Sequence, residues 1–181
     1  ENIWMTIHPP VLFIGYALTL VPFSYAIASL MRHEYHSWIN RAFPWALIAL
    51  FTLGAGILLG GAWAYVSLTF GGFWAWDPVE NSSLVPWMTL VAGLHFMIIS
   101  RRQNFAALAT YILMTLTYVL VLYASFLTRS GVLAETSAHS FGDSGMSGQL
   151  LIFLITFFVI MVVMIAMHAR RINTSRADML L

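Results

Sequence analysis

A single stretch of the chain holds most of the side chains that could do chemistry: residues 71–87, GGFWAWDPVENSSLVPW. It contains three tryptophans and two carboxylates, Asp77 and Glu80, and it lies between strongly apolar runs. An indole ring combines a large flat apolar surface with one N–H donor, and it favours the membrane–water boundary. The stretch is therefore either an aromatic belt on an ordinary loop or a platform on which a flat ligand stacks.

Histidines are the candidate metal ligands, because the chain has six of them and no cysteine. His8 precedes the first apolar run, and His139 precedes the last one. A lone loop histidine is more often solvated than a ligand. Two on the same side of a membrane as the tryptophan stretch could instead bind one haem iron from opposite faces. His8 and His139 are thus either two solvated histidines or the two ligands of one iron.

His95 is a separate case, because it lies inside the third apolar run, about 18 Å along a helix from Ser83. An ionisable side chain at that depth is costly and usually marks a functional site with a partner. His95 therefore either marks a functional site with a partner or is a neutral histidine bonded to a neighbouring helix. His33 and His36 are expected in a solvated loop on the other side of the membrane.

A helix start is encoded in the order Asp77, Pro78, Val79, Glu80. Asp is a favoured N-cap, Pro suits the first helical position, and a Glu three residues after the cap can bond back to it. We expect a short interfacial helix to begin at Pro78. These capping bonds favour a structural role for Asp77 and Glu80, and a direct part in proton transfer is the alternative.

Long apolar helices must position these groups. Hydrophobic residues make up 60% of the 181 residues and charged residues only 8%, which excludes a soluble domain. Crossing a hydrocarbon core of about 30 Å takes about 20 helical residues. We therefore predict an all-α integral membrane protein, a single membrane domain over residues 1–181. Its five spans are expected near residues 11–31, 44–65, 83–100, 105–127 and 150–169, with loops at 66–87 and 128–149.

Arginine placement predicts the orientation, because all eight basic residues are arginine. Seven are expected at one side of the membrane: Arg32, Arg41, Arg101, Arg102, Arg170, Arg171 and Arg176. By the positive-inside rule that side is cytoplasmic, so the N-terminus and both loops lie outside and the C-terminus inside. Arg129, on the outer side, either anchors its span or pairs with a haem propionate. The net charge of +1 gives no indication of nucleic-acid binding.

Two further patterns lie on the spans. Gly56 and Gly60 form a small-xxx-small pattern, which we interpret as close helix packing. Polar residues of the fourth span recur at helical spacing. We favour the interpretation that these residues form hydrogen bonds between helices, and the alternative is that they line a cofactor site. The residues are Tyr111, Thr115, Tyr118 and Ser125.

The tryptophan stretch resembles the "WWD" signature of the haem-handling proteins of cytochrome c maturation, carried here by Trp74-Ala75-Trp76-Asp77-Pro78-Val79-Glu80-Asn81. The Pro-Val-Glu-Asn ending, followed by Pro86-Trp87, is most similar to the CcmF-type haem lyases, which include NrfE proteins. The CcsA branch also continues with Asp-Pro. By this resemblance, His8 and His139 match the two external histidines of CcmF proteins. His95 matches the first of two membrane histidines that ligate a b-type haem.

The resemblance implies a haem lyase that joins haem vinyl groups to the CxxCH thiols of apocytochrome c. The residues it implies for catalysis are His8, His139, Trp76 and Asp77. Those it implies for binding haem are Gly72, Trp74, Trp76, Asp77, Pro78, Glu80, Asn81, Trp87, His95 and Arg129. A haem transporter or exporter is the alternative function. An electron-transfer cytochrome b ranks last, because it would need two bis-histidine pairs within the membrane.

The implied partners are a CcmE-like haem chaperone, apocytochrome c and CcmH/CcmI-like proteins. The implied location is the bacterial inner membrane or its organellar equivalent. CcmF-type chains are much longer, so we expect a middle fragment or one product of a split gene. The second membrane histidine would then lie beyond this sequence.

Overall fold

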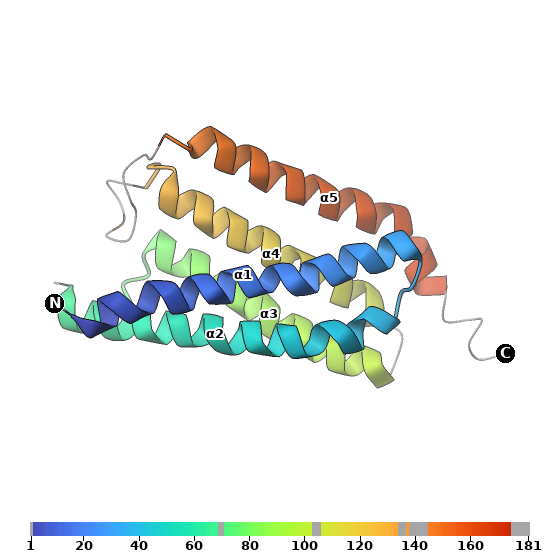
Figure 1. Cartoon of the computed structure of the whole chain (residues 1–181), viewed down its shortest axis with the longest axis horizontal. Helices are drawn as coiled ribbons and strands as arrows, with labels where there is room; N and C mark the ends of the chain where they lie inside the picture. The colour runs from blue at the N-terminus through green and yellow to red at the C-terminus, as the bar shows by residue number, and fades with distance from the viewer. Residues whose placement is uncertain (1, 69–70, 103–105, 134–136, 138–144, 175–181) are drawn as a thin grey trace.

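The computed structural model describes residues 2–68, 71–102, 106–133, 137 and 145–174. These residues form five long helices: α1 (Ile3–Arg32), α2 (Ser37–Ser67), α3 (Pro78–Arg102), α4 (Ala107–Arg129) and α5 (Ser147–Thr174). All five are long and apolar enough to cross a membrane. Figure 1 shows them running broadly along one common axis. The predicted fold class, an all-α integral membrane protein with five long apolar helices, is confirmed.

Helix α1 begins at Ile3, well before the predicted start. The Asn2 side chain caps it by accepting a hydrogen bond from the backbone N–H two residues on, at 3.0 Å. Pro9 and Pro10 therefore lie inside the helix, where each removes only one backbone N–H. As a result, His8 is a helical residue and not a loop residue as predicted.

Helices α1 and α2 pack with their backbones in contact. A Cβ atom added to Gly15 would lie 2.6 Å from the Leu53 Cα, and one added to Gly56 would lie 2.7 Å from the Leu12 Cα. Such an approach requires residues without a side chain. The interpretation of the small-xxx-small pattern as a helix-packing motif is confirmed for Gly56, whereas Gly60 faces a histidine ring.

The predicted helix start at Pro78 is confirmed, because α3 begins at that residue. The prediction of a short interfacial helix is wrong: α3 continues through Pro86 to Arg102. Two serines near its start do not end it. Ser82 and Ser83 each donate a hydrogen bond to the carbonyl three residues earlier, at 2.7 and 2.8 Å. The connection that carries the tryptophans thus leads directly into a helix of membrane length.

Polar side chains of α4 divide between two roles. The Tyr111 hydroxyl lies 2.6 Å from the Ser29 hydroxyl of α1 and donates to the Tyr35 carbonyl at 3.2 Å. Thr115 and Ser125 instead donate to carbonyls of their own helix. The predicted hydrogen bonds between helices are therefore confirmed for Tyr111, and they hold α4 to α1 and to the turn that follows it.

Helix α5 is the least buried of the five, and Figure 1 places it at one edge of the bundle. It packs on α4 and, less extensively, on α1. Near its C-terminal end the His168 ring is 7% exposed and its centroid lies 5.3 Å from that of His33. Tyr35 in the same turn is buried as well. Within the turn between α1 and α2, Tyr35 is therefore packed against the bundle, whereas His33 is exposed, as expected of a solvated loop.

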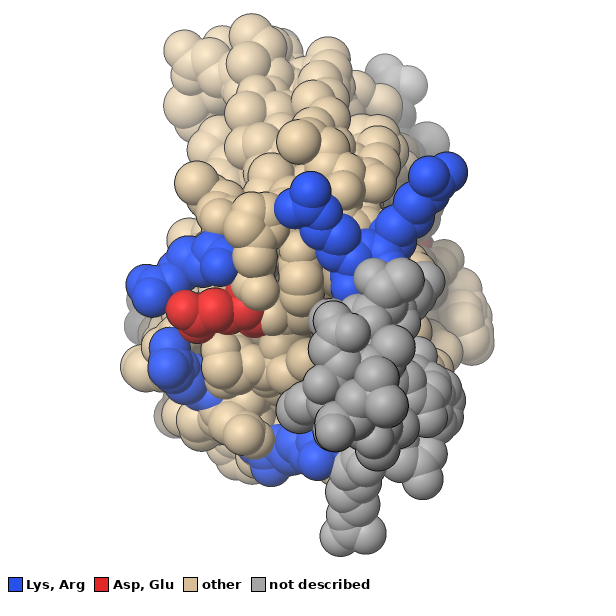
Figure 2. Space-filling model, turned by 90° about the vertical axis from the view of Figure 1, so that its right-hand side faces the viewer, with Lys and Arg blue, Asp and Glu red and all other residues tan. Residues whose placement is uncertain are grey.

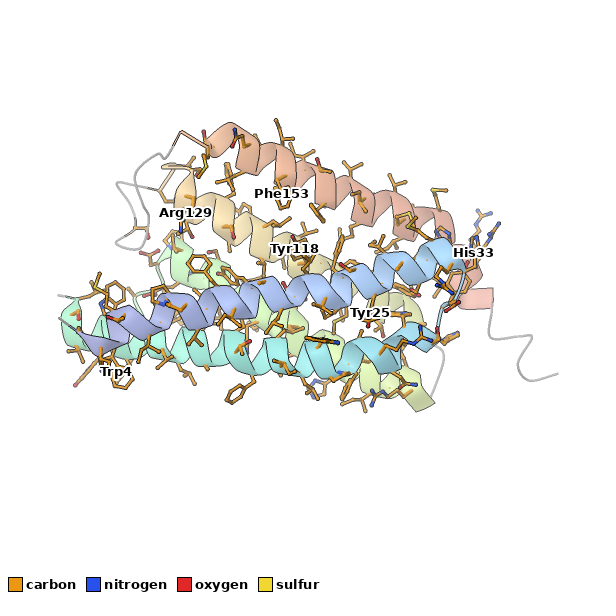
Figure 3. The ribbon with its side chains drawn as sticks, viewed as in Figure 1. Trp4, Tyr25, His33, Tyr118, Arg129 and Phe153 are labelled. Atoms are coloured by element: carbon orange, nitrogen blue, oxygen red, sulfur yellow. The ribbon has the colours of Figure 1, made fainter. Side chains whose placement is uncertain are left out.

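The described arginines other than Arg129 lie on helix ends at one end of the bundle, which we call the arginine end. It is formed by the end of α1, the start of α2, the end of α3 and the end of α5. Figure 2 looks onto this end and shows arginines around an acidic side chain. The acidic group is Glu34, which pairs with Arg32 at 3.1 Å. Arg129 lies at the opposite end, as Figure 3 shows, and we call that end the cavity end.

Candidate functional site

A cavity of about 560 Å³ lies at the cavity end, a size within the range of small-molecule sites. Its walls come from all five helices and from the connection between α2 and α3. Apolar side chains of α1, α2 and α5 form most of the lining, and polar groups of α1, α3, α4 and the connection face the same space. The polar and aromatic members are His8, Phe13, Tyr16, Trp63, Trp74, Glu80, Ser83, Ser125, Thr128 and Arg129.

His8 enters this cavity from α1 with its ring held in place by α2. Its Nδ1 lies 2.8 Å from the Gly56 carbonyl oxygen. The ring is parallel to the Trp63 indole within 8°, with ring centroids 6.4 Å apart. Sequence reasoning missed Trp63, because it lies within an apolar run. Its position one turn after the Gly56 and Gly60 pattern is the sequence feature that could have pointed to it.

The connection between α2 and α3 is held over the start of α3 by the Glu80 carboxylate. Glu80 Oε2 accepts hydrogen bonds from the backbone N–H groups of Ala75 at 2.8 Å and Asp77 at 3.3 Å. The Asn81 side chain donates to the Trp76 carbonyl at 3.1 Å. Trp76 itself adopts a left-handed conformation with φ of 58°. Several side-chain bonds from α3 thus fix this unusual backbone shape.

Asp77 connects the start of α3 to the segment that follows α4. Its Oδ1 accepts a hydrogen bond from the Val79 backbone N–H at 2.7 Å, as an N-cap does. The same oxygen accepts a bond from the Ser137 hydroxyl at 2.7 Å. Asp77 therefore joins two loops that are sixty residues apart, and both of them lie at the cavity end.

The three predicted tryptophans have different surroundings. Trp74 lines the cavity, and its indole nitrogen is buried and has no hydrogen-bond partner among the residues that the structure describes. Trp76 packs edge-on against Trp74 but is 74% exposed. Trp87 lies on α3 against α2, and its N–H donates to the Leu50 carbonyl at 3.2 Å. Of these three, the cavity lining includes Trp74 alone.

Arg129 lies at the end of α4 and contributes to the cavity lining. Its guanidinium carbon is 5.8 Å from the centroid of the Phe13 ring, so it extends across the cavity toward α1. The cation thus faces the same space as His8 and Trp74.

His95 lies apart from the cavity, exposed on the surface of α3. Its Nδ1 donates to the Val91 carbonyl of the same helix at 2.8 Å. The expected alternative, a bond to a neighbouring helix, is therefore not what the described part of the chain shows. The ring points out of the bundle formed by these residues.

The remaining predicted site residues are peripheral or not described. Gly72 lies in the connection, and Pro78 is exposed at the start of α3. His139 lies outside the described residues. Among the residues that the structure describes, there is no group of three or more His, Asp or Glu side chains that could hold a metal ion. His8 is the histidine among them that the cavity brings together with Trp74, Glu80 and Arg129.

Comparison with known proteins agrees with these features. The profile of the family "Cytochrome C assembly protein" matches residues 1–133. The biogenesis protein CycK of Bradyrhizobium diazoefficiens is 39% identical over 160 residues, 88% of this chain and 24% of that protein. CcmF of Escherichia coli is 39% identical over 156 residues, 86% of this chain and 23% of that protein. NrfE of Haemophilus influenzae is 34% identical over 176 residues, 97% of this chain and 27% of that protein.

A solved structure, "Cytochrome c Heme Lyase CcmF", matches this fold with a TM-score of 0.77 at 28% identity. The match covers 92% of this chain and 26% of that one. The chain thus spans between 23% and 27% of the length of these relatives. It belongs to the cytochrome c assembly protein family, and within that family it is of the CcmF type.

Proposed function

We propose that this chain forms the external haem site of a cytochrome c haem lyase. The observation that carries the proposal is the cavity itself, which brings an imidazole, an indole and a guanidinium together at the end of the bundle that has few arginines. The family membership places the chain in cytochrome c maturation. The lyase activity, the haem and the orientation described below are our proposals.

The residues of the cavity suit haem. The His8 imidazole is a good iron ligand, and apolar walls accommodate a porphyrin. Within the described part of the chain the buried Trp74 N–H has no partner, so it could donate to an acceptor on a bound molecule after a small shift. The Arg129 guanidinium suits the propionate groups that porphyrins carry. Each chemical part of haem therefore meets a matching side chain.

In this mechanism the chain positions the reactants and supplies no nucleophile. When bound, haem supplies the vinyl carbons that become attached to thiols. His8 and His139 would hold the haem iron through their imidazole nitrogens. Trp74 and Trp76 orient the edge of the haem ring. Gly72, Pro78 and Asn81 belong to the loop and helix start beside these two indoles. Trp87 holds α3 against α2. Because the chain has no cysteine, the thiols come from apocytochrome c.

Asp77 and Glu80 act on the loop that carries the tryptophans. Both carboxylates accept backbone hydrogen bonds, which hold this loop above the cavity. A loop held in one shape keeps the indole rings in place while the apocytochrome binds. We therefore propose a positioning role for both residues.

His95 would serve a second, b-type haem within the membrane. Its exposure on α3 supports this, because an imidazole on the surface of this bundle is accessible to a partner from another segment. The proposed second ligand comes from outside the chain described here. Replacing His95 by Ala should remove one low-spin haem signal and leave the cavity haem in place, as measured by absorption and EPR spectra. An unaltered spectrum would favour a structural role.

The proposed setting is the bacterial inner membrane or its organellar equivalent, with the cavity end outside. A CcmE-like chaperone would deliver haem there, and a CcmH/CcmI-like protein would present apocytochrome c. The histidine of the substrate's CxxCH segment could also bind iron, so it would compete with His8 and His139 for the haem.

The function is tested by supplying the purified membrane protein with reduced haem and an apocytochrome c. We expect thioether-linked product, detected as a covalent haem–peptide mass and a shifted pyridine haemochrome band. His8→Ala should lower both haem retention and product, and added imidazole should partly restore haem. Transfer of haem to an acceptor without covalent product would instead favour a transporter.

A further inference from the structure

Three residues of α2 lie against the ring of His8. Gly56, Gly60 and Trp63 are spaced at i, i+4 and i+7, so they share the face of α2 that is turned to α1. The pattern of Gly56 and Gly60 was interpreted from the sequence as helix packing alone. The structure shows that it also contacts the imidazole.

The first contact determines the tautomer of His8. A carbonyl oxygen can only accept, so His8 Nδ1 must carry the proton in its 2.8 Å bond to Gly56. In the neutral ring the lone pair is then on Nε2. This is the arrangement by which a backbone carbonyl orients a metal-binding histidine and raises its basicity.

The second contact excludes a side chain at position 60. A Cβ atom added to Gly60 would lie 2.7 Å from His8 Cε1, 2.9 Å from Nδ1 and 3.2 Å from Nε2. Three ring atoms are this close because the ring lies over the Gly60 backbone. Even a methyl group there would have to displace the whole ring.

The third contact fixes the ring plane. Trp63 is parallel to the imidazole within 8°, with an offset stack of 6.4 Å between ring centroids. Trp63 and Gly60 are neighbours on the same helix, so rotation of the ring is limited by both.

We propose that the Gly56 carbonyl, Gly60 and Trp63 form a seat that orients His8 so that Nε2 is the nitrogen that binds iron. The three are positioning residues, since they act through His8. This inference rests on the proposed role of His8 as an iron ligand. Gly56 also keeps the two backbones in contact, so it is not a useful site for mutation.

The decisive variant is Gly60→Ala in the protein purified from membranes with its bound haem. The external haem signal is defined as the part of the low-spin absorption and EPR spectrum that His8→Ala removes. We expect Gly60→Ala to weaken external haem binding by roughly 10- to 100-fold, the range found when partners of metal-binding histidines are lost. The control is Gly148→Ala, where an added Cβ meets nothing within 4 Å, and it should leave the signal unchanged.

A second pair of variants adds no volume to the packed interface. Trp63→Ala removes the stacked ring and should shift the low-spin EPR signal and the midpoint potential of the external haem. Trp63→Phe keeps an aromatic ring and should restore both toward the starting values. If Gly60→Ala fails to accumulate in the membrane, the two Trp63 variants decide whether α2 orients His8.

The outcomes separate the two proposals. If His8→Ala removes the signal while Gly60→Ala and Trp63→Ala keep native binding and spectra, the seat is wrong and His8 remains a ligand. If His8→Ala changes nothing, the proposed ligand role itself fails, and the seat fails with it. If Gly60→Ala and Trp63→Ala lose or shift the external haem signal while Gly148→Ala keeps the native signal, the result supports the seat.

Discussion

The indole N–H of Trp74 lies at the cavity, where it is buried and meets no hydrogen-bond acceptor from residues 2–68, 71–102, 106–133, 137 or 145–174. A buried donor without a partner costs free energy, and a bound acceptor would recover it. Trp76, two residues on, is 74% exposed and outside the cavity lining. The two indoles therefore differ in what they can contribute to a ligand, although the sequence presents them as equivalent.

This difference leads to a prediction for two matched substitutions. Trp74→Phe keeps an aromatic ring but removes the N–H, and we expect haem affinity to fall by roughly 5- to 30-fold, as loss of about 1–2 kcal/mol implies. Trp76→Phe should have little effect on affinity. Haem titration monitored by absorbance measures both. If both substitutions change haem affinity equally and only slightly, the tryptophans of residues 71–87 are better interpreted as an aromatic belt.

At the residue scale, sequence reasoning identified His8 from its chemistry but could not identify what holds it. The His8 seat depends on α2 passing directly under the ring, which is a property of the packing of two helices. Trp63 is one more aromatic residue in an apolar run until that packing is known. Trp87, predicted as a haem contact, instead bonds to α2, because α3 is turned so that this indole faces Gly54.

At the scale of elements, local capping signals were the most reliable guide. The Asp77 and Glu80 bonds form as the capping motif predicts, since they depend only on residues close in the chain. The length of α3 was missed, because a short helix from Pro78 and a span from Ser83 were predicted as separate elements, whereas the structure joins them in one helix. The start of α1 was missed because two prolines were assumed to lie at a helix start and not inside it.

Substitutions at Asp77 can distinguish a role in positioning the tryptophan loop from a role in proton transfer. Asn can accept the same bonds from the Val79 N–H and the Ser137 hydroxyl, so Asp77→Asn should retain most thioether formation. Asp77→Ala removes the cap, at a cost of about 0.5–2 kcal/mol, and should lower activity and thermal stability together. Ser137→Ala serves as the control that removes the hydroxyl bond between loops and leaves the bond from the Val79 N–H to Asp77. A severe loss of turnover in Asp77→Asn with normal haem binding would favour proton transfer.

The turn between α1 and α2 gives a pH-dependent prediction. Burial lowers the pKa of His36 below its usual 6.5. Its stabilising contribution is therefore present above pH 6.5 and is lost as pH falls through the lower, folded-state pKa. We expect the melting temperature in detergent to fall between about pH 7.5 and about pH 5.5, and His36→Gln to reduce this dependence.

A second group in the same turn titrates in a different range. The pKa of Glu34 is lowered below 4.5 by the hydrogen bond from Ser37 and by the charge of Arg32. Its contribution is thus lost only in more acidic solution, outside the range used for His36. An identical pH dependence in His36→Gln and in the unmodified protein would contradict the assignment to His36.

At the scale of the whole molecule, the two ends of the bundle have opposite character. Arginines surround one end, whereas the opposite end holds Arg129, the cavity and the capped tryptophan loop. Composition and span length were enough to predict the five helices, because a hydrocarbon solvent leaves few alternatives to long apolar helices. The depth of the cavity and the outward face of His95 depend on helix rotation, which apolar runs do not encode.

The orientation of the two ends can be measured directly, since this chain has no cysteine of its own. Val132, 67% exposed beyond α4, marks the cavity end, and Ser37, exposed at the start of α2, marks the arginine end. By the positive-inside rule, a membrane-impermeant maleimide should label Val132→Cys in sealed right-side-out vesicles, and Ser37→Cys only after permeabilisation. The reverse pattern would place the cavity on the cytoplasmic side. Haem would then have to be attached on that side, which would contradict the proposed external site.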